Sequence, residues 1–360
     1  METILAINPG STSTKIAVYQ DETPLFVESI AHSLEEVGKY ENVFDQYEFR
    51  KDVVIKTLEE KGIKPETLTA VVSRCGLLPP INSGAYYIND DMVWQLEFNP
   101  ENPHASNVGA PIAYAIAKEL NIPALVYDGI TVNEMIPLTR ISGLKSLPRK
   151  TLCHHLNMHA CAIRWEKETG KALSESNLII CHLGGGITLT LRSNDRVIDG
   201  VSDEEGPFSP ERTGSIAAYQ LVSMCYSGDY PTRKDLMNAI KGHGGLIDHL
   251  GTNDTRDVEK MIADGDEYAK LVYEAMALSV AKKIVSLSAT VCGKVDGIIL
   301  TGGIAKSDYF TGMVKERISF IAPVSVYGGE NEMESLAFGA LRVLRGEEKA
   351  QEFKKVEGKF

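Results

Sequence analysis

A run of amide, hydroxyl and ammonium side chains around one glycine is the first candidate for chemistry. The segment N-P-G-S-T-S-T-K at residues 8–15 contains Asn8, Ser11, Ser13 and Lys15. Backbone N–H groups and hydroxyls in such a turn can hold phosphate oxygens. A Walker A loop would need a second glycine before the lysine and a helix after it, but β-branched residues follow Lys15. The segment therefore predicts a phosphate-holding turn between two strands, not a P-loop.

A second glycine turn of the same kind lies in the other half of the chain. Gly184, Gly185 and Gly186 follow an apolar run and precede the alternating segment I-T-L-T-L-R-S. Three glycines allow a close approach of the backbone to a ligand. A dinucleotide-binding motif does not fit, because Leu189 stands where the last glycine is required and a strand pattern replaces the helix. The repetition of one strand–turn–strand unit predicts two related halves.

A third glycine signal is V-D-G-I-I-L-T-G-G at residues 295–303. The apolar run predicts a parallel strand, which places Gly302 and Gly303 at its carboxyl end. Open α/β sheets bind ligands at that end, and a following helix offers its N-terminus to phosphate. The pair therefore predicts a nucleoside or phosphate contact, with a plain strand-to-helix turn as the alternative.

Arginines and a carboxylate stand at the predicted ends of strands and loops. Arg74 ends the strand pattern 68–74, and Arg212 lies in P-F-S-P-E-R-T-G-S, where a loop is expected to enter a helix. A guanidinium offers a planar fork for carboxylate or phosphate oxygens, although a surface ion pair is the alternative. Asp128 ends the strand pattern 122–128 and is placed for Mg²⁺, usually through water.

Histidines gather in two places. His182 begins the second glycine turn, and H-H-L-N-M-H contains His154, His155 and His159. A zinc site is improbable because the glutamate of H-E-x-x-H is missing. A quietly packed core imidazole remains the alternative for each of them. His104, in E-N-P-H-A-S-N, is a weaker candidate on the substrate side.

The elements that must position these residues follow from hydrophobic periodicity. The strand patterns cover 3–8, 16–20, 24–30, 68–74, 122–128, 178–200 (with its turns), 295–301 and 323–327. The helix patterns cover 48–61, 107–121, 213–226, 266–292, 307–321 and about 333–345. Strands that alternate with helices predict an α/β fold with a largely parallel sheet covered on both faces. Segments 79–106 and 228–257 are predicted as long loops, and 346–360 as a charged tail.

Composition narrows the class of protein. The chain has 360 residues, 43% hydrophobic and 24% charged, which predicts a globular protein of two domains. A net charge of -12 without basic runs weighs against nucleic acid or a membrane as partner. A basic leader and a membrane-length apolar stretch are both missing. Six cysteines without a C-x-x-C pair predict buried free thiols in the cytoplasm.

The order of these motifs resembles the acetate and butyrate (short-chain carboxylate) kinase family, within the superfamily of acetate and sugar kinases, heat-shock chaperones and actin. I-N-P-G-S-T-S-T-K resembles the family's I-N-x-G-S-S-S-x-K, and C-H-L-G-G-G resembles H-L-G-N-G. V-V-S-R-C-G around Arg74 resembles the family's arginine motif, and H-H-L-N-M-H resembles H-G-T-S-H. The resemblance runs from Ile7 to about Gly339.

The resemblance implies two duplicated actin-like domains, each a mixed sheet flanked by helices, with a cleft between them. The expected domains are 1–150 plus about 335–360, with the carboxylate side and first phosphate turn, and 151–334, with the nucleotide side. The implied activity is reversible phosphorylation of a short-chain carboxylate by ATP, giving an acyl phosphate and ADP. Mg²⁺ is the implied cofactor, and a homo-oligomer, dimer or larger, is the implied assembly.

The resemblance also implies roles for single residues. Arg74, Arg212, His155, His182 and Asp128 are expected to act on the transferring group. The family's metal-associated glutamate matches Glu332, with Glu334 as the alternative, beside Asn8 and Asp128. Glu330 and the acids around it otherwise suit a solvated helix start.

Departures from the family pattern point to one branch. Gly186 replaces an asparagine, T-G-G-I-A-K-S differs from T-A-G-I-G-E-N, and V-H-G-G does not follow the arginine. These variants look most like the butyrate kinase branch, with acetate, propionate and branched-chain fatty acid kinases as alternatives. An ATP-driven chaperone or scaffold is the alternative from another class.

Overall fold

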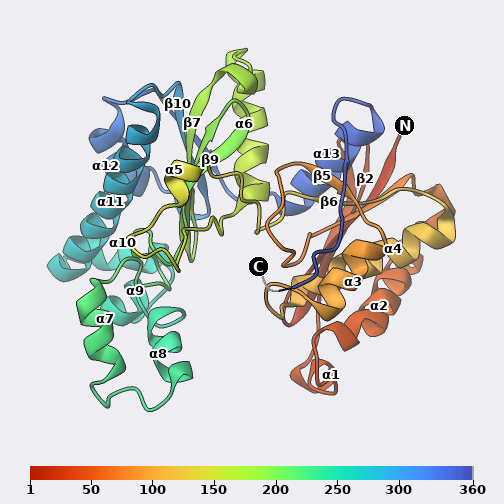
Figure 1. Ribbon diagram of the computed structural model, residues 1–360, viewed down its shortest axis with the longest axis horizontal. Helices are drawn as coiled ribbons and strands as arrows, with labels where there is room; N and C mark the ends of the chain where they lie inside the picture. The colour runs from red at the N-terminus through yellow and green to blue at the C-terminus, as the bar shows by residue number, and fades with distance from the viewer. Residues whose placement is uncertain (359–360) are drawn as a thin grey trace. The chain divides into compact units, whose positions relative to one another are not determined.

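The computed structural model describes residues 1–358 and separates into two compact units (Figure 1). The first unit comprises Met1–Val132 and the chain from Asn331 onward, and the second comprises Asn133–Glu330. The division after Val132 lies earlier than the expected residue 150. The intervening segment belongs to the second unit, where the backbone N–H of Val197 donates to Glu134 Oε2 (2.9 Å).

The first unit is built on a seven-stranded mixed sheet in the order β12-β5-β6-β4-β1-β2-β3. Its strands are β1 (Thr3–Pro9), β2 (Ser13–Gln20), β3 (Thr23–Ala31), β4 (Ala70–Ser73), β5 (Ala85–Tyr87), β6 (Ala124–Tyr127) and β12 (Gln351–Glu352). β1 pairs antiparallel with β2 and parallel with β4, so the carboxyl ends of β1 and β4 lie at the same edge. The N-terminal strand–turn–strand prediction is confirmed, and so is the mixed sheet that the resemblance implied, in place of the largely parallel sheet that alternating strands and helices alone predicted.

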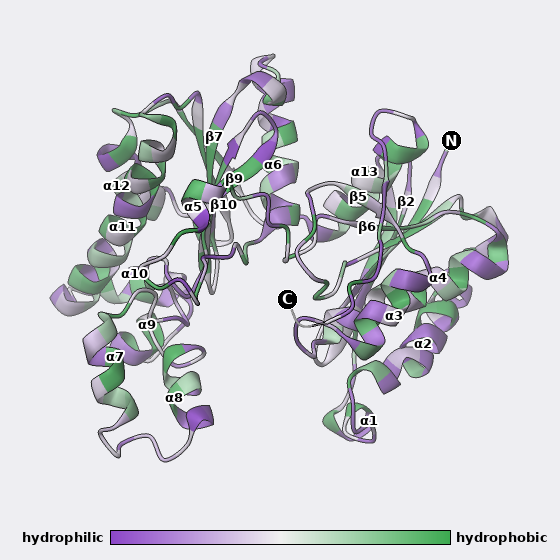
Figure 2. Cartoon of the chain, viewed as in Figure 1, coloured by the Kyte–Doolittle hydropathy of each residue, from purple (hydrophilic) through white to green (hydrophobic). Residues whose placement is uncertain are grey.

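Helices cover both faces of this sheet. They are α1 (Leu34–Val37), α2 (Tyr47–Glu60), α3 (Asp90–Phe98), α4 (Gly109–Leu120) and α13 (Glu332–Leu344). Arg50 of α2 contacts Thr14 of β2, while Phe338 of α13 packs on Tyr19 of the same strand. Thr14 and Tyr19 are an odd number of residues apart and so point to opposite faces. In Figure 2, α2 and α4 carry hydrophobic and hydrophilic bands, as expected of helices with one buried face.

The second unit repeats the opening arrangement in a five-stranded sheet ordered β11-β10-β7-β8-β9. Its strands are β7 (Asn177–Leu183), β8 (Ile187–Ser193), β9 (Arg196–Val201), β10 (Gly297–Gly302) and β11 (Val324–Gly328). β7, β8 and β9 form antiparallel pairs, and β10 is parallel to both β7 and β11. The predicted repeat of the N-terminal unit is therefore confirmed.

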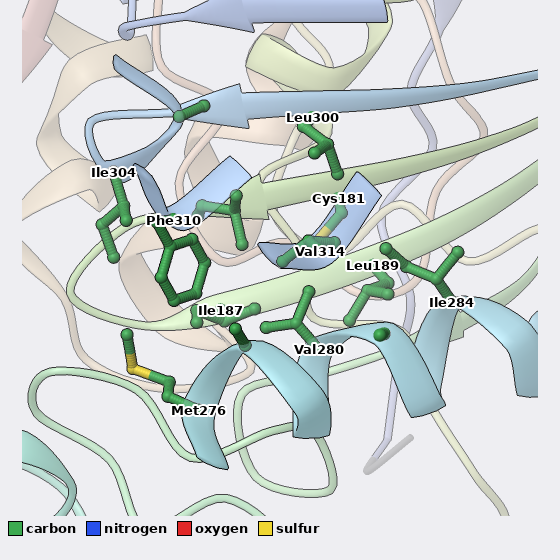
Figure 3. Packing of buried hydrophobic residues seen from close by; sticks show 14 of the residues in the cluster. Cys181, Ile187, Leu189, Met276, Val280, Ile284, Leu300, Ile304, Phe310 and Val314 are labelled. Atoms are coloured by element: carbon green, nitrogen blue, oxygen red, sulfur yellow. The ribbon is translucent and has the colours of Figure 1, made fainter. Parts of the chain in front are cut away.

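Two hydrophobic clusters lie on the two faces of the second sheet. The helices are α5 (Pro137–Arg140), α6 (His155–Thr169), α7 (Ala218–Cys225), α8 (Arg233–Ile240), α9 (Leu246–Leu250), α10 (Thr255–Ala263), α11 (Glu267–Ser288) and α12 (Asp308–Ile318). Ile179 and Cys181 of β7 join the cluster with α11 and α12, of which Figure 3 shows the packing. Leu178 and Ile180 join the cluster with α6 on the other face. Because successive residues of β7 point to opposite faces of the sheet, this strand packs against helices on both faces.

Short 3₁₀ turns complete the elements of both units. They are η1 (Phe44–Gln46), η2 (Pro65–Thr67), η3 (Ala105–Val108), η4 (Leu173–Glu175), η5 (Ala289–Val291) and η6 (Ile304–Lys306).

Several predicted boundaries were wrong, each for a tertiary reason. The helix predicted from residue 213 begins at Ala218, because Gly214 has φ +62° and the Ser215 N–H bonds the Gly206 carbonyl. The predicted loop 79–106 contains β5 and α3, and 228–257 contains α8, α9 and the start of α10. The predicted tail contains β12, which pairs with β5, and Phe353 is buried. Residues 359–360 of that tail lie outside the described residues.

The cysteines are free thiols, as predicted, but their burial differs. Cys75, Cys153, Cys161 and Cys181 are buried, whereas Cys225 and Cys292 are exposed. Burial raises the pKa of the Cys75 thiol to about 12, which makes it a poor nucleophile. Within residues 1–358, no helix has both the length and the apolar composition needed to cross a membrane.

Candidate functional site

The β1–β2 turn carries the first predicted phosphate residues. Asn8 and Lys15 are partners across the antiparallel pair, and the Gly10 N–H closes the turn on the Ser13 carbonyl (2.8 Å). Ser11 is exposed, and Asn8, Ser13 and Lys15 are half-buried. The turn therefore offers hydroxyls, an amide and an ammonium group to an anion at the carboxyl end of β1.

A buried arginine that no sequence pattern indicated holds this turn from behind. Arg50 of α2 is fully buried and donates to the carbonyls of Ser13 (2.8 Å) and Ser11 (3.1 Å) and to Thr14 Oγ1 (3.0 Å). Its other acceptor is the amide oxygen of Gln46 (2.9 and 3.1 Å). These acceptors are neutral, so a positive charge is buried directly behind the turn, and its burial lowers the pKa of Arg50. Only the tertiary contact distinguishes this arginine from others in a helix pattern.

Asn8, Arg74 and Glu332 meet in the first unit. Asn8 Nδ2 donates to Glu332 Oε2 (2.7 Å), and Arg74 donates to Glu332 Oε1. The Arg74 and Glu332 side chains remain 25% and 29% exposed, so a ligand can reach both. Glu334 lies elsewhere, because its charge acts on the Tyr19 hydroxyl and raises the pKa of Tyr19 together with the larger effect of burial. Of the two glutamates considered for the metal, Glu332 is the one beside Asn8.

Asp128 and His104 of the first unit are engaged in local structure. Asp128 follows β6 with φ +41°, and its Oδ1 accepts from Ser83 Oγ and Gly84 N, both at 2.8 Å. His104 caps η3 through the Ser106 N–H (3.1 Å), which gives this exposed side chain a structural role. The predicted functions of both residues stay predictions.

The second glycine turn has space only for glycine at its tip. A Cβ on Gly184 would lie 2.9 Å from His182 Nε2, one on Gly185 would meet the Glu211 carboxylate, and one on Gly186 would meet Asp203. The Gly185 carbonyl accepts from Ser209 Oγ (2.7 Å) and the Glu211 N–H (3.1 Å). The turn is therefore fixed by the loop that follows β9.

That same loop positions Arg212. Its Nε lies 3.2 Å from Asp203 Oδ2, and its NH1 lies 3.2 Å from Glu211 Oε2. Because Asp203 and Glu211 also touch the glycine turn, the structure brings Arg212 to the Gly185–Gly186 side of that turn. The guanidinium is held by two carboxylates that an incoming anion would have to replace or share.

His182 lies at the centre of a buried polar cluster. It is the penultimate residue of β7, is 1% exposed, and has its Nε2 3.0 Å from Glu330 Oε1. The ring of His154, which was not among the predicted catalytic residues, stacks on it with centroids 3.9 Å apart. His155 is buried at the start of α6, and His159 turns toward Asp195 (4.0 Å), at the β8–β9 turn. The histidines of the H-H-L-N-M-H motif therefore do not share one environment.

A cavity of about 660 Å³ in the second unit is lined by glycines from two of the predicted segments, the turn at 184–186 and the pair at 302–303. Its walls include Gly184, Gly185, Gly303, Ile304 and Glu330. Gly302 instead faces the backbone: its φ is +92°, and a Cβ would lie 2.4 Å from the Leu183 carbonyl oxygen. Gly303 thus lines the cavity, and Gly302 allows the tight turn beside it.

Further polar residues of this cavity were not predicted individually. They are Glu211, Asn253, Asp254, Arg256, Glu259, Lys306 and Ser307. Arg256 pairs with Asp254 (2.5 Å) and lowers the pKa of that carboxyl to about 2. For Asn253, Asp254 and Arg256, the sequence signal was the length of segment 228–257, which is typical of loops that line a functional cleft.

The residues that could hold Mg²⁺ in this structure would do so through oxygen atoms. No group of three or more His, Cys, Asp or Glu that could hold an ion occurs in the described part of the chain. Mg²⁺ commonly takes one or two carboxylates and fills its other positions with phosphate oxygens and water. Glu332 with the neighbouring Asn8 amide fits that donor set, because both side chains are half-buried where the start of α13 meets the end of β1.

These observations define the class of fold. Each of the two units has an opening antiparallel trio of strands, added parallel strands and helices on both faces, and this is the actin-like fold of the solved acetate and propionate kinases. The crystal structure of Porphyromonas gingivalis acetate kinase superimposes with a TM-score of 0.80 at 16% identity, covering 96% of this chain and 100% of that one. A propionate kinase from Francisella tularensis gives 0.75 at 18% identity, covering 94% and 99%.

The family follows from sequence comparison. The model of the acetokinase family matches residues 146–339. Butyrate kinase 1 of Clostridium acetobutylicum is 46% identical over 356 residues, which are 98% of this chain and 100% of that protein. The chain belongs to the acetokinase family.

Proposed function

We propose that this protein is a short-chain carboxylate kinase that transfers the γ-phosphoryl group of ATP to butyrate, reversibly. The observation that carries the proposal is the 46% identity to butyrate kinase 1 along nearly the whole of both chains. The family match supports the class of reaction, in which a carboxyl group is the acceptor. The products are butyryl phosphate and ADP, and the reverse reaction makes ATP.

The acceptor needs no general base. A carboxylic acid has a pKa of about 4 to 5, by analogy with glutamate, so butyrate is ionised near pH 7. The protein must instead bring two anions together and neutralise charge on the transferring group. A sugar kinase, by contrast, has to remove a proton from a hydroxyl.

The chain's cations and neutral donors suit that task. Arg74 in the first unit and Arg212 in the second are each paired with carboxylates and partly exposed. His182 Nε2 lies directly beside Gly184, so close that a Cβ on that residue would come within 2.9 Å of the ring nitrogen. Each can donate to the phosphoryl or carboxylate oxygens, and such a donor contributes about two to three orders of magnitude in rate.

Mg²⁺ completes the charge balance. When bound, it neutralises phosphate oxygens and orients the transferring group. Glu332 would hold it, with the Asn8 side chain beside it, and Asp128 would act through water. The Arg74 guanidinium keeps the Glu332 carboxylate in place on that side.

The nucleotide is assigned to the second unit. Its cavity of about 660 Å³ has the size of a small-molecule site and ends at Gly184 and Gly185. We place the adenosine part between the β10–α12 turn at Gly303 and the Asp254–Arg256 segment, and the phosphates at the glycine turn. Backbone N–H groups of such turns hold phosphate oxygens.

A hydroxamate-trapping assay tests the proposed function. Purified protein with ATP, MgCl₂ and hydroxylamine is given straight and branched acids of two to five carbons. The expected result is acid-dependent hydroxamate, with the highest kcat/KM for butyrate and a loss of about 1 to 3 kcal/mol of transition-state binding for each methylene removed. ADP release that is independent of the acid would favour a chaperone-like ATPase.

Assembly and location stay predictions. We propose a homo-oligomer in the cytoplasm, and light scattering after size-exclusion chromatography measures the assembly. An exclusively monomeric mass would contradict it.

A further inference from the structure

The side-chain amide of Asn157 lies between His182 and Thr301, inside the second unit. Its Nδ2 is 3.0 Å from His182 Nδ1 and 3.1 Å from Thr301 Oγ1. All three side chains are buried, at 6%, 1% and 0% exposure. A buried polar group in such a place is costly unless each of its hydrogen bonds is made.

The direction of these hydrogen bonds follows from Thr301. Its Oγ1 lies 2.7 Å from the Tyr327 carbonyl oxygen and 3.4 Å from that of Gly329; both can only accept, so the hydroxyl hydrogen points to that side, toward the nearer Tyr327 oxygen. The Thr301 oxygen is then left to accept from its other neighbours, which are the Asn157 amide and the Cys161 thiol (3.3 Å). The Asn157 atom that faces Thr301 must therefore be the NH₂ group and not the amide oxygen.

The same NH₂ group sets the proton on His182. It has two hydrogens, and one points at Thr301 while the other points at His182 Nδ1. That ring nitrogen must accept, so the neutral imidazole carries its hydrogen on Nε2. The stack with His154 fixes the plane of the ring, and His154 is itself held by Thr188 Oγ1 (2.9 Å from Nδ1).

The Nε2 side of the ring meets an anion in the structure. Glu330 Oε1 lies 3.0 Å from Nε2 and belongs to a half-exposed side chain that lines the nucleotide cavity. A carboxylate oxygen is the same kind of acceptor as a phosphoryl oxygen. The Nε2 side of the ring therefore faces the glycine turn and this carboxylate oxygen, although Nε2 makes no hydrogen bond within residues 1–358.

We propose that Asn157 is a positioning residue that holds His182 in the Nε2–H tautomer, so that this N–H donates to the phosphoryl group. The inference rests on the proposed function for the identity of the acceptor. With the hydrogen on Nδ1, Nε2 would present a lone pair to an anionic oxygen, and the donor would be lost. Asn157 touches no reacting atom and acts only through His182.

Asn157→Asp tests the assignment with little change of shape. A carboxylate cannot donate, so it accepts a hydrogen from Nδ1 and reverses the tautomer. Asn157→Ala removes the donor without adding a charge, and serves if the Asp variant does not fold. Cys161→Ala is the matched control, because it removes the other side-chain donor to Thr301, one helical turn later, and leaves Asn157 in place.

The readout is ¹⁵N NMR of the full-length protein labelled on histidine, with the His182 signals assigned by His182→Gln. We expect a protonated Nε2 and an unprotonated Nδ1 in the wild type and in Cys161→Ala, and the reverse in Asn157→Asp. In kinetics, kcat of Asn157→Asp should fall about 100-fold, while KM for ATP changes less than threefold. Asn157→Ala should give a mixture of tautomers and a smaller fall in kcat.

Two results would overturn the inference. One is a wild-type ring with its hydrogen on Nδ1. The other is a folded Asn157→Asp protein that keeps both the wild-type tautomer and the wild-type kcat. The tautomer is read without substrate, so a wild type with the expected tautomer but no acyl phosphate would refute the proposed function and leave the assignment of the proton standing.

Discussion

Arg74 and Glu332, which are 258 residues apart in the sequence, form an ion pair within the first unit. The same carboxylate accepts from Asn8 at the end of β1 (2.7 Å). One side chain thus connects the ends of β1 and β4 with the start of α13. This arrangement places an oxygen donor for Mg²⁺ beside an arginine that can bind an anion.

Removing the charge of Glu332 should therefore affect the metal first. In Glu332→Gln, we expect the Mg²⁺ concentration for half-maximal activity to rise at least about tenfold and kcat to fall about 10- to 100-fold, the usual scale for an electrostatic contribution. Titration of activity with MgCl₂ measures both. Glu334→Gln is the control, because Glu334 lies beside Tyr19, and it should stay within about twofold of wild type. Equal effects of the two substitutions would refute the assignment.

Arg50 should matter for both stability and turnover. Arg50→Met keeps much of the volume but leaves the Ser11 and Ser13 carbonyls without their donor, and each such loss costs about 1 to 3 kcal/mol. We expect urea unfolding to show a loss of about 2 to 5 kcal/mol, and kcat to fall because the turn is no longer held. Lys56→Met, at an exposed position of the same helix, is the matched control. An unfolding free energy equal to that of wild type would contradict the role of Arg50.

His32 predicts a dependence of stability on pH. It is buried against Thr14 Oγ1 (2.7 Å), and burial, with a smaller effect from the Arg50 charge, lowers its pKa below the usual 6.5. The unfolded chain then binds a proton more readily than the folded one. The stability is therefore full above about pH 6.5 and is lost as the pH falls from there toward the folded pKa.

Urea unfolding at pH 7.5 and 5.5 measures this difference. His32→Gln should reduce it, because glutamine can bond Thr14 but does not titrate. His243→Gln, at an exposed histidine, should leave it unchanged. If the His32 variant shows the full wild-type difference, other groups cause the pH dependence.

Gly339 and Gly312 should respond oppositely to alanine, although both lie within helices. A Cβ on Gly339 of α13 would lie 2.6 Å from the Tyr127 ring, whereas one on Gly312 of α12 meets nothing within 4 Å. Alanine favours a helix by about 0.8 to 1 kcal/mol over glycine, but overpacking a core costs about 1 to 3 kcal/mol. We expect Gly312→Ala to raise the melting temperature and Gly339→Ala to lower it. A higher melting temperature in Gly339→Ala would show that the contact relaxes cheaply.

Features with local causes could be predicted from the sequence. The turns after β1 and β7 follow from alternating strands around glycine, and α11 follows from the long apolar period of 266–292, although the helix already ends at Ser288. β5 and β12 could not be predicted, because each is short and is defined by its partners in the sheet, with Tyr86 paired to Gln351. Local patterns do not report contacts at such separations.

The residues of the candidate site also fall into those that the sequence predicts and those that it does not. Asn8 and Glu332 were predicted together from a family resemblance, and the structure brings them into contact. Arg50, Asn157 and Arg256 carry no local signal, because their roles depend on which backbone or ring lies opposite. Their roles can be inferred only from the structure, which shows the acceptor that each side-chain donor contacts.

Synthesis of ATP from butyryl phosphate and ADP is the decisive test of the proposed carboxylate kinase activity. We expect ATP in proportion to the butyryl phosphate consumed, with Mg²⁺ required and at least about a 100-fold loss of rate in Arg74→Ala and in Arg212→Ala. The absence of ATP from every acyl phosphate of two to five carbons, in folded protein that still hydrolyses ATP without any acid, would contradict it.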